Sequence, residues 1–494
     1  MTAVPRALSV GATLALLGAY AALCFVYLSV FSPGVWVGGV VVSTVVRVGD
    51  GGAMYDTGGT LLGPTWPYFP GIVLLARALA AVGVPVLLLP VLIGSTSVLA
   101  LPVVAAGVAR AAGARWWPAL AVSLCLHALA MTRYHTFEMM AAGAFPDALV
   151  AELLLGTCLV VARIERSGTS SWREKLALGA VLVAAGLSKQ VGVAGVVGTF
   201  AYLVLGSRLR GRPRGELLGV VAASGAIVLA VVLATPGCFH HTVVVIGRHA
   251  RDWSRLGVLV EHLVGWQLLA LLLYAACLPA VRRASDEVRH LFACSHAILL
   301  PVIVVQVLAT VKEGGGGQWD SYNMELVVSL LLPVPVWALA TLVNRARPVW
   351  QAGVLAVVAA VGATASLDAR GRTVARRDGA AASVAATVAE LHQLARPGLA
   401  FAHESEAWAL YRAGFRLATG TSALWHYAVA DPTLQDPRWL EGLERALRER
   451  RYAVIQPTWM QSLPDAVVER LRPSIDAGYT PALDGRWLVP RPEP

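Results

Sequence analysis

Long apolar runs separated by short polar segments make up the chain from its N-terminus to about residue 366. Many runs hold about 20 residues, which is enough for a helix to cross a hydrocarbon core of roughly 30 Å. The pattern therefore predicts a polytopic α-helical membrane protein with about 11 transmembrane helices. The predicted helices cover residues 8–30, 87–109, 117–134, 147–164, 175–188, 191–207, 216–235, 258–281, 291–311, 325–343 and 348–366.

The segment between the first two predicted helices, residues 31–86, holds the Gly-rich stretch RVGDGGAMYDTGG and the Pro-rich stretch PTWPYFPG. Trp and Tyr are favoured at the interface between lipid and water. Residues 70–85 are apolar but follow the Pro-rich stretch, so we predict a helix lying along the membrane surface. We take residues 31–86 as the first outer loop.

After residue 366 the pattern changes to short strand-like and helix-like segments that alternate along the chain, which is typical of a soluble α/β domain. GLAFAH and YAVIQP are predicted strands, and ESEAWALYRAG and RWLEGLERALRERR are predicted helices. Asp484-Gly485 lies between two apolar pieces, which is a hairpin signal. We therefore divide the chain into a membrane part, residues 1–366, and a small C-terminal α/β domain, residues 367–494.

Composition and charge agree with this division. Hydrophobic residues are 57% of the chain and charged residues only 14%, whereas a soluble globular chain carries about 25% charge. The net charge of +10 does not indicate a nucleic-acid partner, because Lys and Arg gather in alternate short loops. By the positive-inside rule the richer loops face the cytoplasm. We expect a plasma-membrane protein with a cytoplasmic N-terminus and an extracytoplasmic C-terminal domain.

Three acidic residues are candidates for chemistry. Asp50 and Asp56 flank Tyr55 in the Gly-rich stretch of the first outer loop. A carboxylate held there could act as a general base, whereas in a solvated loop it would only cap a turn. Asp147 follows Pro146 and opens an apolar helix, where the helix dipole favours an acid even without a catalytic role. Ionisable groups at membrane depth are nevertheless usually functional.

Basic residues on the predicted outer side are candidates for binding an anion. The chain has three lysines, and Lys189 and Lys312 fall in outer segments, where positive residues are disfavoured. A lysine ammonium can bind phosphate as a compact charge, or its side chain can simply reach the lipid headgroups. Arg248 and Arg251 suit phosphate recognition, but they could equally hold headgroups or the C-terminal domain. No His or Cys spacing indicates a metal site.

The order of these motifs resembles the GT-C superfamily of membrane glycosyltransferases, which use polyprenyl-phosphate-linked sugars, as mannosyl- and arabinosyltransferases do. An acidic loop after the first helix runs from GDGGAMYDTGG into WPYFPG, and an acid opens a later helix in FPDALVAELLL. The tight turn LSKQVGV follows, and a late outer loop reads KEGGGGQWDSYNMEL. The family's acidic pair is absent at Asp50, and Tyr322-Asn323 reverses its usual Asn-Tyr. The choice between Asp50 and Asp56 therefore stays open.

The resemblance implies a transmembrane catalytic domain at 1–366 with an outward-facing site at the membrane surface. It implies inverting transfer of a hexose or pentose from a polyprenyl-phosphate donor to a hydroxyl of a glycan, lipid or protein acceptor. The implied catalytic residues are Asp50, Asp147 and Asp56. The residues expected to bind the donor are Lys189, Gln190, Lys312, Arg248, Arg251, Tyr55 and Tyr68. No cofactor is expected, and a divalent metal is not required, although Asp50 and Asp147 together could bind one.

Two other classes of protein share some of these features. A transporter or flippase of a lipid-linked glycan would have similar helices and charges, but such proteins often show internal repeats and helices broken at mid-membrane. We find no such repeat, and the acids are predicted near the outer surface. The other class is a non-catalytic scaffold whose outer domain binds a partner.

Overall fold

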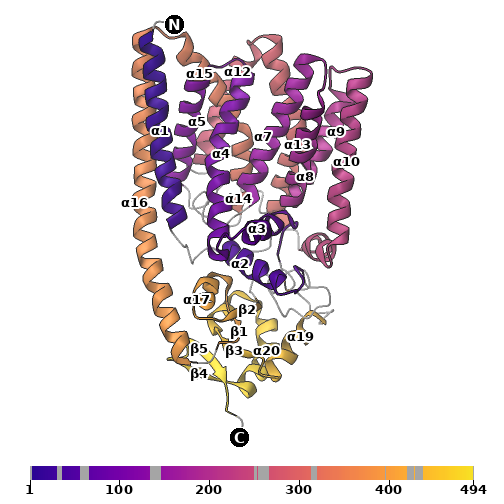
Figure 1. Ribbon diagram of the computed structural model, residues 1–494, viewed down its shortest axis with the longest axis vertical. Helices are drawn as coiled ribbons and strands as arrows, with labels where there is room; N and C mark the ends of the chain where they lie inside the picture. The colour runs from indigo at the N-terminus through magenta and orange to yellow at the C-terminus, as the bar shows by residue number, and fades with distance from the viewer. Residues whose placement is uncertain are drawn as a thin grey trace.

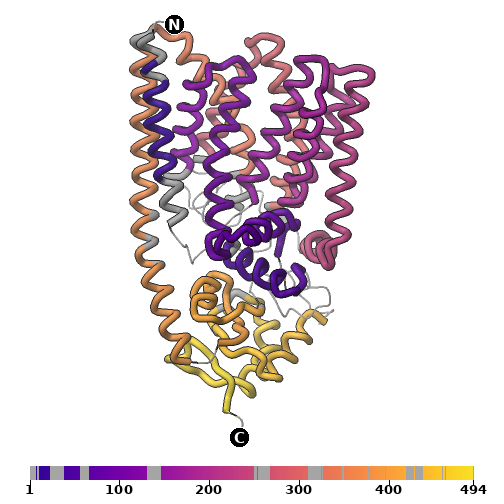
Figure 2. Tube along the Cα trace, in the orientation of Figure 1, coloured from indigo at the N-terminus to yellow at the C-terminus, as the bar shows by residue number. Residues whose placement is uncertain are grey.

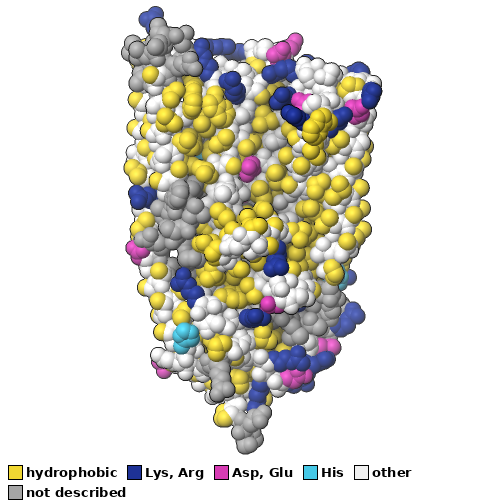
Figure 3. Space-filling model, viewed as in Figure 1, with side chains coloured by type: hydrophobic (Ala, Val, Ile, Leu, Met, Phe, Trp, Pro, Cys, Tyr) yellow, Lys and Arg dark blue, Asp and Glu magenta, His cyan; other side chains and the backbone are white. Residues whose placement is uncertain are grey.

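A bundle of long helices forms one end of the molecule and a small α/β domain forms the other, with two short helices between them (Figure 1). The computed structural model describes residues 3–29, 36–55, 66–133, 146–249, 253, 266–312, 320–394, 397–419, 428 and 438–492. Hydrophobic side chains cover the face of the bundle seen in Figure 3, and Lys and Arg gather at its upper end and around the C-terminal domain.

The bundle follows the predicted order of apolar runs. Its helices are α1 (Ala3–Ser29), α4 (Leu89–Ala111), α5 (Trp116–Arg133), α7 (Pro146–Ser167), α8 (Trp172–Ser188), α9 (Gln190–Leu205), α10 (Arg212–Ala234), α12 (Trp266–Arg282), α13 (Asp286–Lys312), α14 (Asp320–Leu331), α15 (Pro333–Arg345) and α16 (Pro348–Leu394). Within the described residues, four helical segments are long and apolar enough to span a membrane: Val86–Ala111, Arg212–Ala234, Asp286–Ala309 and Trp350–Arg372. Several shorter apolar helices lie beside them, so the predicted number of 11 crossings is not confirmed.

Two predicted helices differ from those observed. The single helix expected over 325–343 is divided into α14 and α15 at Leu332, because Pro333 and Pro335 lack the N–H groups that would continue the hydrogen-bond ladder. The last helix, expected to end at 366, continues to Leu394 as α16. Its second half is polar but rich in Ala and Arg, which are strong helix formers. The predicted division at residue 366 therefore falls inside this helix, which runs beside α1 and on to the C-terminal domain (Figure 2).

The first outer loop contains two helices at the end of the bundle that faces the C-terminal domain (Figure 1). α3 (Gly71–Ala81) lies within residues 70–85, where a helix is predicted. α2 (Trp36–Gly49) was not predicted; its sequence, WVGGVVVSTVVRVG, is rich in β-branched residues, which lower helix propensity. The two helices pack on each other, and α2 also contacts the C-terminal domain.

The C-terminal domain is built around a five-stranded sheet with strand order β2-β1-β3-β5-β4. Its strands are β1 (Leu399–Phe401), β2 (Arg416–Thr419), β3 (Tyr452–Ile455), β4 (Tyr479–Ala482) and β5 (Trp487–Pro490). β1 is parallel to β2 and β3, whereas β5 is antiparallel to β3 and β4. The described helices of the domain are α17 (Ala407–Arg412), α19 (Arg438–Arg448) and α20 (Asp465–Gly478). Asp484 and Gly485 have φ of 53° and 81°, which confirms the predicted hairpin turn.

Among the described residues the domain contacts the rest of the molecule at several places, and two of these involve α16 and α2. At the first, Leu391 of α16 lies in an apolar core with residues of the sheet, and Glu390 Oε1 lies 2.5 Å from Arg486 Nη1. At the second, Val42 of α2 packs with Ala407 and Trp408. The domain is therefore held against α2 as well as at the end of α16.

Gly39 allows α2 and the C-terminal domain to approach each other closely at this second attachment. A Cβ built at Gly39 would lie 1.8 Å from the carbonyl oxygen of Glu404, so no larger residue fits there without a shift of the backbone. Glu404 is in the short 3₁₀ helix η3 (Glu404–Glu406), which leads into α17. The backbone of the C-terminal domain thus lies directly against α2.

Candidate functional site

Lys189 lies alone between two helices. α8 ends at Ser188, α9 begins at Gln190, and Lys189 has extended backbone angles of φ −153° and ψ 150°. A Cβ built at Gly192 would lie 2.0 Å from the carbonyl oxygen of Ala185, so glycine is what allows the two helices to meet at so tight a turn. The structure therefore places one lysine at a break between helices, at the end of the bundle near α3.

The Lys189 side chain pairs with Asp147. The Nζ atom lies 2.6 Å from Asp147 Oδ1, and the two side chains are 13% and 1% exposed. Asp147 stands in the first turn of α7 directly after Pro146, as the sequence predicts, where the helix dipole also favours a carboxylate. Its second oxygen, Oδ2, is buried and has no hydrogen-bond partner among the described residues. One oxygen of this carboxylate is tied to the ammonium and the other remains available.

The Pro-rich segment of the first outer loop lies against this ion pair. The Tyr55 hydroxyl donates to the carbonyl oxygen of Tyr68 at 2.6 Å, and the Trp66 indole N–H donates to that of Phe69 at 2.8 Å. The Tyr68 ring centroid is 5.5 Å from Lys189 Nζ, which is within the range of a cation–π contact. The loop is thereby held against the lysine.

Gln190 links the same loop to a third segment. Its Nε2 donates to the carbonyl oxygen of Pro67 at 3.1 Å and to that of Thr242 at 3.5 Å. Thr242 belongs to a π-helix, η2 (His240–Val245), and such helices occur frequently at functional sites. We call Asp147, Lys189, Gln190, Tyr55 and Tyr68 the lysine cluster.

Asp50 lies outside the lysine cluster, directly after α2. Its Oδ2 is 2.5 Å from Arg416 Nη1 on β2, and the side chains are 45% and 59% exposed. No hydrogen bond or ion pair of the second oxygen, Oδ1, is seen within the described ranges. Burial raises the pKa of Tyr411, which lies nearby on α17.

The helix α3 connects Asp50 with the lysine cluster. A Cβ built at Gly71, the first residue of α3, would lie 2.7 Å from the carbonyl oxygen of Leu187 at the end of α8. A Cβ built at Gly49 would lie 2.8 Å from Nη1 of Arg77, further along α3. Gly71 and Arg77 are six residues apart, which corresponds to about 9 Å of helix. Asp50 and Lys189 therefore lie near two points on one short helix.

The remaining predicted residues do not join these groups in the described structure. Arg248 is exposed after the π-helix. Asp56, Arg251 and the side chain of Lys312 lie outside the described residues. Within the described ranges, no three His, Cys, Asp or Glu side chains come together as a metal site would need.

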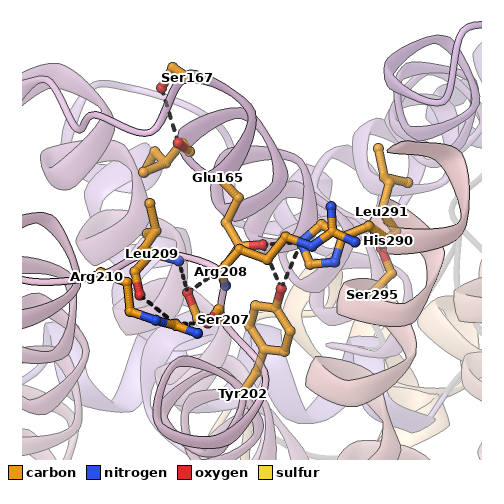
Figure 4. Close-up of polar contacts among 11 residues, drawn as sticks. Glu165, Ser167, Tyr202, Ser207, Arg208, Leu209, Arg210, His290, Leu291 and Ser295 are labelled. Carbon is orange, nitrogen blue, oxygen red and sulfur yellow. Dashed lines mark hydrogen bonds and ion pairs between the residues drawn. The ribbon is translucent and has the colours of Figure 1, made fainter. Parts of the chain in front are cut away.

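Two polar features were not predicted from the sequence. One is Arg416, whose partner Asp50 is 366 residues away, so no local pattern could indicate it. The other is a set of hydrogen bonds around Glu165 (Figure 4), which lies at the other end of α7 from Asp147. The Glu165 side chain is 2% exposed and contacts His290. It also accepts hydrogen bonds from Tyr202 at 2.6 Å and Ser207 at 2.5 Å. These contacts satisfy a buried carboxylate and connect α7, α9 and α13.

The fold matches that of a protein whose structure has been solved. The crystal structure of ArnT from Cupriavidus metallidurans bound to undecaprenyl phosphate has a TM-score of 0.59 at 14% identity, with 95% of this chain and 97% of that chain covered. The apo structure of the same protein has a TM-score of 0.57 at 14% identity, with coverage of 97% and 98%. No model of a protein family matches the chain, and no curated protein matches it. At this identity the likeness shows a shared fold, in agreement with the architecture predicted from the resemblance to the GT-C superfamily.

Proposed function

We propose that this chain, with its GT-C fold, is a membrane glycosyltransferase that moves a sugar from a polyprenyl-phosphate donor to an acceptor hydroxyl. The observation that carries the proposal is the buried pair of Lys189 and Asp147 beside the first outer loop. Undecaprenyl phosphate is the molecule bound in the ArnT crystal structure with the same fold. A lysine at a break between two apolar helices is suited to the phosphate of such a lipid, whose tail would remain among the helices.

Lys189 would stabilise the charge that develops on the phosphate. An ammonium has three N–H donors, and Asp147 takes one of them. The remaining donors could bind phosphate oxygens, and a cation held in place before the reaction needs no reorganisation as negative charge appears. Asp147 would hold Lys189 in position, and its free Oδ2 could accept a hydrogen bond from a sugar hydroxyl.

In the proposed reaction, Asp50 is the general base. The acceptor hydroxyl attacks the anomeric carbon as Asp50 Oδ1 takes its proton. The bond between that carbon and the phosphate oxygen breaks, and the electron pair stays on the leaving polyprenyl phosphate. A single displacement of this kind inverts the anomeric carbon. Such a displacement needs the base and the phosphate-binding cation on opposite sides of the sugar. Asp50 and Lys189 lie near two positions about 9 Å apart along α3, which is compatible with that requirement.

The sugar would be a hexose or pentose, and the acceptor a glycan, lipid or protein. Asp56 is the alternative base, because it lies in the same Gly-rich stretch. The mechanism routes no step through a metal or cofactor. Gln190, Tyr55 and Tyr68 would shape the donor site, and Lys312, Arg248 and Arg251 are further candidates for contacts with the phosphate.

A direct test follows the fate of the donor lipid. Purified protein in liposomes receives undecaprenyl phosphate carrying radiolabelled mannose or arabinose, together with a cell-envelope extract as acceptor. We expect label in the acceptor and free undecaprenyl phosphate in the lipid fraction. Movement of the intact lipid between leaflets without cleavage would instead support the flippase, and neither cleavage nor movement with either sugar would contradict the proposal.

The proposed site requires the C-terminal domain to lie outside the cell. Glu441 on α19 and Thr169, between α7 and α8, are both exposed. A cysteine at Glu441 should react with a membrane-impermeant maleimide in intact cells, and one at Thr169 should react only after lysis. The described native cysteines Cys125, Cys158, Cys238, Cys277 and Cys294 are buried, so their background labelling should be low. The reverse labelling pattern would overturn the topology.

A further inference from the structure

We propose that Arg416 of the C-terminal domain is a positioning residue for Asp50, so that this domain completes the transferase site. The inference rests on the proposed function, since it takes Asp50 as the base. It assigns the C-terminal domain a part in catalysis beyond its attachment to α16. The observation behind it is the ion pair between Arg416 Nη1 and Asp50 Oδ2 at 2.5 Å.

The ion pair leaves one oxygen of the carboxylate available. Arg416 donates a hydrogen bond to Oδ2, and no hydrogen bond or ion pair of Oδ1 is seen in the part of the chain that the structure describes. A guanidinium on one oxygen fixes the plane of a carboxylate and favours its charged form. The other oxygen is then presented in a defined direction, which is what proton transfer from an acceptor hydroxyl requires.

The backbone on each side of the ion pair is held firmly. Arg416 opens β2, and its N–H donates to the carbonyl oxygen of Gly398 at 3.0 Å, while its neighbours Phe415 and Leu417 are buried. Asp50 follows α2 directly, and its N–H bonds the carbonyl oxygen of Val46 at 3.0 Å. Asp50 lies directly beside a helix and Arg416 lies in a strand, so the direction of the carboxylate depends on how the domain packs on α2.

Buried apolar contacts provide that packing independently of the ion pair. Trp408 and Ala407 are fully buried against Val42, and Gly39 allows the backbone at Glu404 to approach closely. An ion pair with both partners about half exposed adds little to stability. Its removal should therefore leave the domain in place and disturb mainly the orientation of Asp50.

The test distinguishes an effect on the orientation of the Asp50 carboxylate from a loss of the folded structure. Arg416→Ala should lower kcat for sugar transfer by about 10- to 100-fold, since a small misplacement of a reacting group can cost about that much. The KM for the donor should change by less than about twofold, because the lysine cluster is untouched. Arg416→Lys should recover most of the lost rate. In the Asp50→Asn background, Arg416→Ala should cause no further loss, because Arg416 would act only through Asp50.

Matched variants distinguish the outcomes. Arg472 on α20 is exposed and has no ion pair among the described residues, so Arg472→Ala should retain full activity. If Asp50→Asn abolishes transfer while Arg416→Ala is fully active, the positioning role is wrong and the proposed function stands. If Asp50→Asn is fully active, the assignment of the base fails first. Should Arg416→Ala not fold, as judged by gel filtration, Arg416→Gln carries the same test.

Discussion

Asp50→Asn should lower the rate of sugar transfer by about 10²- to 10⁴-fold, the usual contribution of a general base. Asparagine has nearly the same shape but cannot take a proton from the acceptor hydroxyl. Asp50 lies outside the lysine cluster, so undecaprenyl phosphate should still stabilise the protein against thermal unfolding. Initial rates with saturating donor, and unfolding curves with and without undecaprenyl phosphate, measure the two effects separately.

The chain offers a matched control for this variant. Asp368 and Arg372 form another ion pair with exposed partners, on α16, at 3.4 Å. Asp368→Asn should leave transfer unchanged, because α16 carries no group of the proposed site. A fully active Asp50→Asn would instead point to Asp56, and Asp56→Asn would then be expected to lose transfer.

Local patterns in the sequence led to the residues of the lysine cluster. Lys189 is one of three lysines and stands where two apolar helices leave almost no loop, and Asp147 opens a helix after a proline. A charge in an apolar setting needs a partner, and the structure pairs these two with each other. Such signals can be read from the sequence because each depends on only a few neighbouring residues.

Hydropathy was a poorer guide to the ends of the helices. It reports the surroundings of a segment and not its backbone conformation, so a helix that continues beyond its apolar part is predicted to end where its side chains become polar. For this reason α16 was expected to end 28 residues before Leu394. α2 was missed for the opposite reason, since its β-branched residues weaken the helical signal although the segment packs on α3 and η3.

The contact between Asp50 and Arg416 could not be predicted at all. It depends on the docking of one folded part on another across 366 residues of sequence, and an exposed arginine at the start of a short strand has no distinguishing local pattern. The ion pair between Asp50 and Arg416 and the one between Asp147 and Lys189 have the same arrangement. In both Asp147 and Asp50, one carboxylate oxygen is tied to a cation and the other has no hydrogen-bond partner among the described residues.

Lys189→Ala should have the largest effect on stability as well as abolishing transfer. The Asp147 carboxylate is 1% exposed, and removing its cation leaves a buried charge without compensation, at a typical cost of about 3–5 kcal/mol. Lys175→Ala is the matched control, since Lys175 pairs with Glu216 at 3.0 Å where both side chains are partly exposed. Exposed pairs contribute about 0–1 kcal/mol, so this control should unfold at nearly the normal temperature in detergent.

A double variant separates the structural and chemical roles of Lys189. Lys189→Met together with Asp147→Asn removes both charges, and replacing a whole buried pair by neutral side chains of similar volume is often tolerated. We expect most of the lost stability to return while transfer and stabilisation by undecaprenyl phosphate stay absent, because no cation remains for the phosphate. Transfer by the double variant at the normal rate would show that Lys189 holds the helices together and takes no part in the reaction.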